Sequence, residues 1–517
     1  MSDKKTSASL STLVVMIATF MSRILGFARN AVVGALFGQS WRADVLNAVF
    51  NIPFNLRKLM AEGALSSAFL PVFTKTLWED PSGGRARDLT RALMSFQILV
   101  LVPLTVVAIV FADPIVAFLA PFKEPEKHAL GVELFRWFIN YLFLVSISAV
   151  MMAVLNSHQK FAVAAVSPIL FSLSVMGSLM LLYPTWGIYA QIPGVLVGGV
   201  AQILMQYFSY RRLGYSLKPK WKFWTPDLKV ILTKWGPALS ISAIALINQQ
   251  VSVALASTLS EGSVSALTNA VVFWQLPAGV LSASVITVFF ARMSRQVAEK
   301  DWEGTSRTMT QGLELQALLL IPAGFLLFLF GEPIISLAFQ RYQFLREDSV
   351  LAAQVLGALS WGLFPAGMFN FLQRFFFAKS DYRTPFWVCV AWSATDISVS
   401  LILMNTSLGV RGLAYGGAAG FIVGAVVLLI FTWKGLPKKQ LVEFLFFIVR
   451  VILALVPLGF LVPWVNGLLG PWWHEGMNLS SMGLLMGLGL VALIVFYVCL
   501  LLLRIDPFKM LKNRGRA

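Results

Sequence analysis

The sequence predicts an all-α integral membrane protein with about fourteen transmembrane helices. Hydrophobic residues make up 58% of the 517-residue chain and charged residues only 13%, whereas apolar residues make up at most about half of a soluble domain. Apolar runs of about 20 residues, the length that crosses a bilayer as a helix, recur from residue 10 to residue 503. Because these runs fill the chain, the composition excludes a soluble enzyme with a single membrane anchor.

The first two predicted spans are unusual because they contain charged residues. Lys4 and Lys5 precede the first apolar run, which continues through Arg23 and Arg29 without a small-residue cleavage site. We therefore expect this run to stay in the protein as a helix rather than to be removed as a signal peptide. The second span contains Pro53, which can kink or break it locally.

The later spans are more uniformly apolar, and short polar loops separate them. Three consecutive amides at 248–250 interrupt the seventh span, and the eleventh contains the isolated carboxylate of Asp396. In chain order the predicted spans cover residues 9–36, 43–75, 90–113, 132–156, 161–184, 187–210, 233–259, 264–291, 307–331, 350–377, 384–405, 410–433, 442–466 and 481–504.

The distribution of Lys and Arg tests this order of spans. If the N-terminus is cytoplasmic, 28 of the 41 Lys and Arg lie in inner segments and 6 lie in outer loops. Cytoplasmic loops of membrane proteins carry such an excess, and one miscounted span would scramble it. We therefore expect an even number of spans with both termini in the cytoplasm. The net charge of +17 accordingly sets topology and does not indicate a nucleic-acid-binding surface.

A faint internal repeat divides the chain into two halves. Asn51-Ile52-Pro53 is echoed by Gln275-Leu276-Pro277, and the turn ending at Lys160-Phe161 is echoed, at a nearly equal offset, by the turn ending at Asp381-Tyr382. Transporters are often built from two such repeats with the substrate bound between them. We predict an N-terminal six-helix half, a basic cytoplasmic linker, a C-terminal six-helix half, and two additional helices with a basic tail, at residues 1–212, 213–234, 235–433 and 434–517.

The basic linker has two interpretations. Lys and Arg occupy seven positions between residues 211 and 234. Topology and contact with anionic lipid headgroups explain such a loop in the first interpretation. In the second, the loop is a site for a specific partner.

Polar side chains form one face of the second span. Asn55, Lys58, Glu62 and Ser66 are spaced so that they lie on one side of a helix, and Arg57 widens this stripe. A charge near the bilayer centre costs about 2.5–3.5 kcal/mol on insertion scales. Two explanations stay open for Lys58 and Glu62: an ion pair that only stabilises the bundle, and a polar cavity for an anionic substrate.

The arginines of the first span favour the cavity. Arg23 and Arg29 are six residues apart, so they point in different directions and one carboxylate cannot easily neutralise both. With two more cations in the second span they outnumber the acids Asp44 and Glu62. A planar guanidinium binds two phosphate oxygens at once, and snorkelling of an arginine to the interface is the alternative. We predict that a phosphate-bearing substrate is bound by Arg23, Arg29, Arg57 and Lys58.

Asp396 is a candidate for coupling transport to an ion gradient, because a lone membrane carboxylate can bind Na⁺ or a proton. A buried, hydrogen-bonded core residue is the alternative. We find no phosphate-binding glycine loop, no histidine pair at metal-ligand spacing, no Ser-His-Asp arrangement, and no basis for a disulfide between Cys389 and Cys499. The sequence therefore predicts a transporter without a cofactor or metal site rather than an enzyme, and Na⁺, H⁺ or the membrane potential would supply its energy.

These residues resemble the MurJ/MviN family of lipid II flippases over essentially the whole chain. The resemblance rests on a long N-terminal motif and weaker later ones, at Ser22–Arg29, Asp44, Leu56-Arg57-Lys58, Ala61–Ala64 with Phe69, Trp235–Ala238, Asp381 and Thr384-Pro385. It implies an exporter of the MOP superfamily in the bacterial inner membrane. Such a protein moves lipid II, a lipid-linked peptidoglycan precursor, from the inner to the outer leaflet by alternating access, and so serves cell wall biogenesis and cell shape.

The resemblance also implies roles for individual residues. The arginines Arg23, Arg29 and Arg57 match family arginines that contact the pyrophosphate, and Asp44 and Glu62 match acidic positions linked to gating or activity. The last two helices would form a groove for the lipid tail. The expected partners are lipid II or a related lipid-linked precursor, membrane lipids and cell-wall synthesis proteins.

The chain departs from the family pattern at three places. Asn30 replaces the usual aspartate after the second arginine, and Trp392, one turn before Asp396, offers no oxygen ligand for sodium. Val271-Val272 replaces an Asp-Arg pair, so the C-terminal half lacks a cation expected to face the cavity. A flippase for another polyprenyl-pyrophosphate-linked glycan and a non-transporting cell-wall scaffold are therefore alternatives. A drug or cation antiporter would need an acidic cavity.

Overall fold

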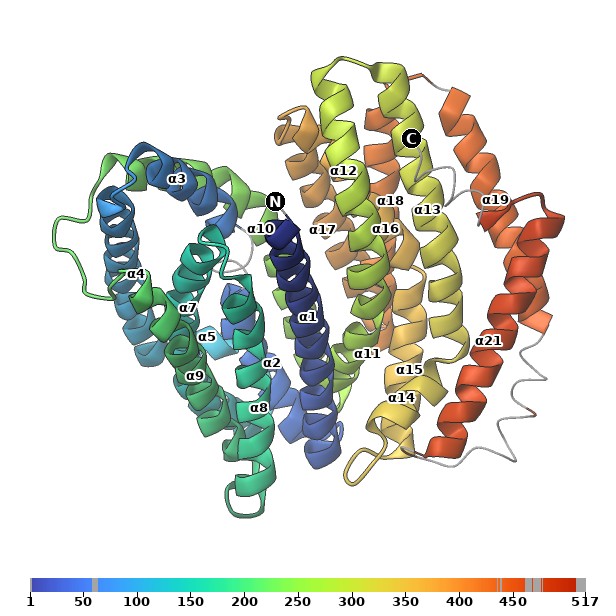
Figure 1. The fold of residues 1–517 in the computed structure, drawn as a ribbon. Coiled ribbons are helices and arrows are strands. Elements are labelled where there is room, and N and C mark those ends of the chain that lie inside the picture. The colour runs from blue at the N-terminus through green and yellow to red at the C-terminus, as the bar shows by residue number, and fades with distance from the viewer. Residues whose placement is uncertain are drawn as a thin grey trace. The chain divides into compact units, whose positions relative to one another are not determined.

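The predicted fold class is confirmed by the computed structural model, which describes residues 2–57, 64–434, 436–437, 439–460, 467, 476 and 478–507. Within these residues every regular element is a helix (Figure 1). The chain divides into two compact units, Met1–Val264 and Ser265–Ala517, which we call unit 1 and unit 2. Each unit is described by itself.

Unit 1 has two apolar cores. The first lies where α2, α6, α7 and α8 meet, and the second lies where α3, α4, α7 and α9 meet. The helix α8 packs along both α1 and α9. The helices of unit 1 are α1 (Ser2–Phe37), α2 (Trp41–Arg57), α3 (Ala64–Glu79), α4 (Gly84–Val110), α5 (Ala112–Leu119), α6 (Pro125–Phe138), α7 (Asn140–Ser157), α8 (Phe161–Trp186), the 3₁₀ helix η2 (Gly187–Ala190), α9 (Gln191–Arg212) and α10 (Pro226–Ser257).

Unit 2 has a core between α13, α19 and α21, and its closest helix pair is α17 with α18. The helix α11 begins at the boundary between the units and is followed by one π-helical turn after Pro277. The helices are α11 (Ser263–Pro277), the π-turn η3 (Ala278–Ser282), α12 (Ala283–Ala298), α13 (Trp302–Leu329), α14 (Gly331–Phe339), α15 (Arg346–Ser360), α16 (Leu363–Ala378), α17 (Arg383–Met404), α18 (Val410–Trp433), α19 (Lys439–Phe460) and α21 (Leu479–Leu502).

The helices are long and apolar enough for a protein that crosses the membrane many times. Among the described residues, 11 helical runs qualify as spans, or 12 if α15 and α16, which are bent by 45°, form one span. One run, Phe161–Arg212, has 52 residues and contains α8 and α9. A single helix of that length would be about 78 Å long, more than twice the hydrocarbon thickness, so this run holds two crossings. The total of about fourteen stays a prediction.

The second predicted span corresponds to two helices. The helix α2 continues through Pro53 without a break and reaches Arg57, and α3 begins at Ala64. The intervening residues, 58–63, lie outside the described part of the chain. A kink at Pro53 is compatible with this helix, but a break there is not observed.

The order of helices in unit 1 recurs in unit 2. A long helix, a short one and two medium ones follow one another as α4 to α7 and again as α13 to α16. The short helices start at Ala112 and Gly331, and the helices α8 and α17 start at Phe161 and Arg383, so nearly equal lengths of chain separate the two pairs. This separation is close to that of the sequence echoes. The boundaries of the predicted six-helix halves stay a prediction.

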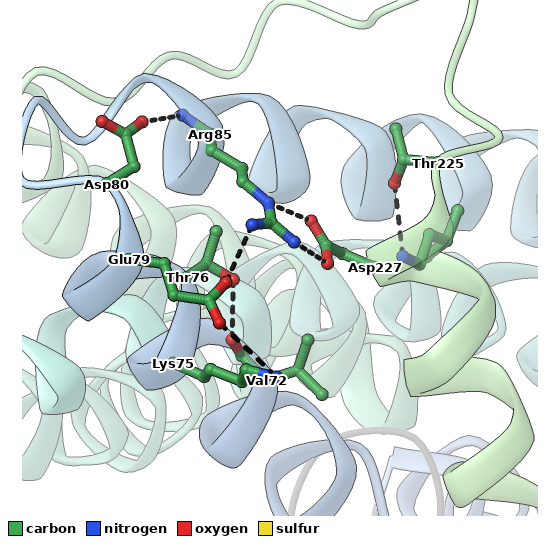
Figure 2. Close-up of polar contacts among 9 residues, drawn as sticks. Val72, Lys75, Thr76, Glu79, Asp80, Arg85, Thr225 and Asp227 are labelled. Atoms are coloured by element: carbon green, nitrogen blue, oxygen red, sulfur yellow. Dashed lines mark hydrogen bonds and ion pairs between the residues drawn. The ribbon is translucent and has the colours of Figure 1, made fainter.

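Ion pairs of Arg85 fix the beginning of α10, directly after the segment that follows α9, within unit 1. The guanidinium of Arg85 binds Asp227 through Nη2 (2.6 Å) and Glu79 through Nη1 (2.8 Å), as Figure 2 shows. The helix α10 begins inside the range predicted as linker, because the hydroxyl of Thr225 accepts the Leu228 N–H and Pro226 occupies the first turn. Arg85 therefore ties the end of α3 to the beginning of α10.

Candidate substrate-binding site

Arg29 projects from α1 toward α8. Its guanidinium carbon lies 5.4 Å from the ring centroid of Phe171, a cation–π contact, and the side chain is half-buried. Its Nη2 donates a hydrogen bond to Oδ1 of the neighbouring Asn30 (3.3 Å). Asn30 is neutral, so the residue directly after Arg29 accepts this bond without supplying an opposite charge.

Arg57 ends α2 and has a similar environment. Its guanidinium carbon lies 4.6 Å from the ring centroid of Phe54, one turn earlier on the same helix, and the side chain is half-buried. The aromatic face covers one side of the guanidinium and fixes its orientation.

Arg29 and Arg57 lie within electrostatic reach of each other, although they come from different helices. Like charges in a partly buried place repel, and the repulsion is relieved when an anion binds between or beside them. Tyr141 of α7 lies within the same reach of Arg29, and its ring packs 4.9 Å from that of Phe171. Four helices of unit 1, α1, α2, α7 and α8, thus supply the two cations and the rings beside them.

The structure gives fewer contacts for the other predicted substrate-binding residues. Arg23 is an exposed side chain on α1, six residues before Arg29 and on a different face of the helix. Lys58 and Glu62 lie outside the described residues, so the polar stripe of the second span is represented by Asn55. Asn55 is buried, with 4% of its surface exposed. The roles of Arg23, Lys58 and Glu62 stay predictions.

Asp44 lies in the first turn of α2 and holds the loop that follows α10. Its Oδ2 accepts the main-chain N–H of Gly262 at 2.7 Å, and the carboxyl group is buried. A parallel contact joins the Trp41 N–H to Oε1 of Glu261 (2.8 Å). These two bonds fix the beginning of α2 to the turn between α10 and α11.

This position separates Asp44 from the arginine pair. Asp44 and Arg57 stand at opposite ends of α2, which places them about 20 Å apart along its axis. Asp44 therefore does not neutralise Arg57. Its contacts suit a residue that controls how α2 and α10 are joined, which is the predicted gating role, and that role stays a prediction.

Asp396 is buried in unit 2 between α17 and α18. Its Oδ1 accepts a hydrogen bond from the Ser400 hydroxyl (3.0 Å), one turn later. Glycines of α18 bring the helices together here: a Cβ at Gly420 would lie 3.0 Å from the Asp396 Cβ, and one at Gly416 would overlap the Ser400 hydroxyl. Among the described residues no group of three or more His, Cys, Asp or Glu could hold a metal ion. Coupling through Asp396 stays a prediction.

Arg374 is an intramembrane arginine to which the sequence reasoning gave no role. It lies on α16, half-buried between the rings of Phe290 (5.9 Å) and Phe377 (5.6 Å), like the arginines of unit 1. The available signal was its position inside an otherwise apolar span. Unit 2 therefore does carry an aromatic-flanked arginine despite Val271-Val272.

Comparison with known families identifies the family of this chain. A family model described as "Lipid II flippase MurJ" matches residues 33–483. The matched range begins after Arg23 and Arg29 and contains Asp44, Arg57 and Asp396.

Two relatives carry the same name. A protein of Borreliella burgdorferi named "Probable lipid II flippase MurJ" is 34% identical over 497 residues, which cover 96% of this chain and 97% of the relative. A protein of Burkholderia cenocepacia named "Lipid II flippase MurJ" is 26% identical over 462 residues, which cover 86% of this chain and 88% of the relative.

Solved structures agree on the fold. A structure titled "Lipid II flippase MurJ, inward closed conformation" matches with a TM-score of 0.77 at 24% identity, over 95% of this chain and 100% of that one. An inward-facing multidrug resistance transporter of the MATE family in the MOP superfamily matches with a TM-score of 0.63 at 16% identity, over 82% and 97%. At these identities the two structures show the fold alone. The family model and the Borreliella relative together show that this multi-pass membrane protein belongs to the MurJ family of lipid II flippases.

Proposed function

We propose that this chain flips lipid II from the inner to the outer leaflet of the bacterial cytoplasmic membrane by alternating access. Membership of the MurJ family supports the substrate class. The structural observation that carries the proposal is the pair Arg29 and Arg57, two half-buried guanidinium groups of unit 1 that each lie against an aromatic ring. Such a pair binds the pyrophosphate that links lipid to sugar.

The energetics favour a polyanion. Each guanidinium is held on an aromatic ring, so its orientation is fixed before the substrate arrives. Pyrophosphate accepts charge-assisted hydrogen bonds from both, and each such bond contributes about 1.5–3 kcal/mol. A neutral or cationic substrate would leave the repulsion in place, which argues against a drug antiporter.

The remaining parts of the mechanism follow from the predicted roles. Asp396 would take up Na⁺ or a proton, or the membrane potential would act directly, to return the carrier. Asp44 would govern the junction between α2 and α10. Both termini would face the cytoplasm, as the positive-inside bias predicts, and cell-wall synthesis proteins would receive the product.

The test is translocation of lipid II in proteoliposomes by the purified full chain, together with rescue of a bacterium depleted of its own lipid II flippase. We expect wild type to be active, and Arg29→Ala and Arg57→Ala each to lose about 10- to 100-fold. Arg42→Ala is the matched control, because Arg42 lies on the same helix as Arg57, also contacts an aromatic ring (Trp41, 5.1 Å) and is exposed. It should be near wild type.

The outcomes separate the alternatives. Full activity of both arginine variants, with normal abundance, would contradict the cationic site and favour the scaffold. A well-expressed wild type that moves no lipid II but moves another polyprenyl-pyrophosphate glycan would replace the substrate and leave the site intact. Equal loss in Arg42→Ala would show a general effect of charge and not a site.

A further inference from the structure

The segment between α9 and α10 has an inner and an outer side. Its inward residues, Leu213, Tyr215, Leu217 and Phe223, pack into the core formed by α3, α4, α7 and α9. The His158 ring also bonds the Tyr215 hydroxyl (Nε2 to Oη, 2.8 Å). The segment is therefore built into unit 1, and the side chains on its other side are presented by a fixed backbone.

The outward side chains are aromatic and basic. The side chain of Trp221 is 98% exposed and that of Trp224 is 64% exposed. Lys218 and Lys222 are exposed beside them, and Asp227, the next acid along the chain, is engaged by Arg85 (Figure 2). Two tryptophans exposed to this extent on a basic segment suit a surface that is both apolar and anionic.

Contacts with α4 fix the depth of this segment. The Arg91 Nε donates to the Lys218 carbonyl (3.1 Å), and the Lys220 N–H donates to the Ser95 hydroxyl (2.6 Å). The Lys220 ammonium also pairs with Asp88 (2.8 Å). The segment thus runs beside the first turns of a helix that spans the membrane and does not project away from it.

From the distribution of charged and exposed apolar residues we expect position 95 of α4 at the edge of the hydrocarbon layer. The charged residues of α4 end at Arg91, and no charge follows from Ala92 to Val110. Its exposed apolar side chains begin at Leu99, about 6 Å along the axis from Ser95. Trp221, next to Lys220, is therefore at the level of the lipid headgroups, where tryptophan is enriched in membrane proteins.

From this geometry we infer that residues 218–224 form a membrane-surface anchor that binds anionic phospholipid headgroups. Trp221 and Trp224 enter the headgroup layer, and Lys218 and Lys222 contact the phosphates. The positive-inside bias assigns this face to the cytoplasm, where anionic lipid gives the leaflet a negative surface potential. The anchor leads directly into α10, whose first turn is fixed to the first turn of α4 by the Arg85–Asp227 ion pair.

Lipid binding to the purified full chain tests the charge component. Native mass spectrometry would measure retention of phosphatidylglycerol and phosphatidylcholine. A lysine near a membrane surface contributes about fivefold in affinity for anionic lipid, so the double variant Lys218→Gln/Lys222→Gln should bind phosphatidylglycerol about 25-fold more weakly. Phosphatidylcholine binding should not change. The control is Lys123→Gln, an exposed lysine in the turn between α5 and α6, which should change affinity less than twofold. Wild-type phosphatidylglycerol binding by the double variant, or equal weakening by Lys123→Gln, would overturn the anchor.

Depth in the bilayer tests the aromatic component independently. A nitroxide is attached at Pro219→Cys in a chain carrying Cys389→Ala and Cys499→Ala, reconstituted in vesicles of equal parts phosphatidylethanolamine and phosphatidylglycerol. The comparison label is at Ser82→Cys, in the exposed turn before α4. We expect a water-soluble nickel relaxant to reach position 219 less than position 82, and Trp221→Ala to raise its access to 219. Equal access of the nickel relaxant to positions 219 and 82, in the chain that keeps Trp221, would place the segment in water and contradict the proposal.

Discussion

The carboxylate of Asp44 accepts the main-chain N–H of Gly262 across 2.7 Å, joining residues 218 positions apart in the chain. Both groups are buried. The bond ties the first turn of α2 to the turn after α10, and it places Asp44, for which we predict a gating role, at a junction between helices rather than at the arginine pair.

Removing this acceptor should weaken the junction. Asp44→Ala leaves a buried N–H without its partner, which costs about 1–3 kcal/mol. We expect a lower melting temperature for the detergent-purified protein and impaired lipid II translocation. Asp44→Asn keeps an acceptor oxygen, so it should recover stability more than activity if the charge matters for gating. Equal behaviour of Asp44→Asn and wild type in both measurements would reduce Asp44 to a structural residue.

Gly262 should tolerate no side chain. Its φ is +85°, a left-handed conformation, and a Cβ would lie 2.9 Å from the Gln39 carbonyl oxygen. Gly262→Ala should therefore destabilise the protein by about 1–3 kcal/mol through strain and displacement of the Asp44 bond. Thermal unfolding checks this. Gly214, with φ +83° and only the Arg87 side chain in ordinary contact (3.7 Å), is the control: Gly214→Ala meets only the conformational cost.

Asp381 should contribute to stability except at acid pH. Partial burial raises its pKa, but hydrogen bonds from the Thr384 hydroxyl (2.6 Å) and N–H (3.1 Å) and from the Arg383 N–H (3.0 Å) outweigh it, so the pKa lies below its usual value. Because the folded pKa is below the unfolded one, the stabilisation is present above about pH 4 and is lost as the pH falls further. Asp381→Asn should lower the melting temperature at neutral pH and flatten its decline toward acid. Glu126→Gln, at an exposed carboxylate, should leave the melting temperature and its decline toward acid unchanged. A parallel decline of the melting temperature in wild type and Asp381→Asn would contradict the assignment.

Asp396→Asn should separate folding from coupling. The amide oxygen still accepts the Ser400 hydroxyl, so the variant should fold and insert normally. Its loss of charge should change how lipid II translocation depends on a Na⁺ or proton gradient across the vesicle membrane. Unchanged dependence on both gradients would remove Asp396 from the coupling scheme and leave it as a core residue.

Replacing Arg374 should raise the stability of the protein and lower its transport activity. Its Nε is buried without a hydrogen-bond acceptor among the described residues, and a buried donor in that state costs about 1–3 kcal/mol. Arg374→Met keeps most of the volume between Phe290 and Phe377, so we expect a higher melting temperature and slower translocation. A stabilised variant with full activity would assign Arg374 to packing alone.

Long apolar helices were predictable, and their partners were not. The predicted spans 161–184 and 410–433 agree with α8 and α18 to within two residues, because each is a continuous apolar run bounded by charged residues or glycine. The short helices α5 and α14 were missed, since eight or nine residues are too few to register as a span. The arginines were visible as intramembrane charges. The contact between Asp44 and Gly262 was not, because nothing in local sequence links residues so far apart.

The glycines of α18 recur at every fourth position, at Gly412, Gly416, Gly420 and Gly424, and each receives side-chain or main-chain atoms from across the helix interface. Such a surface packs closely against its neighbour only where a glycine faces it. Sliding α18 along α17 by a fraction of a turn would bring the larger residues between these glycines against α17. The only displacement that preserves the fit is therefore a shift by four residues, about 6 Å. If unit 2 changes shape during transport, α17 and α18 should travel as one piece, carrying Asp396 with them.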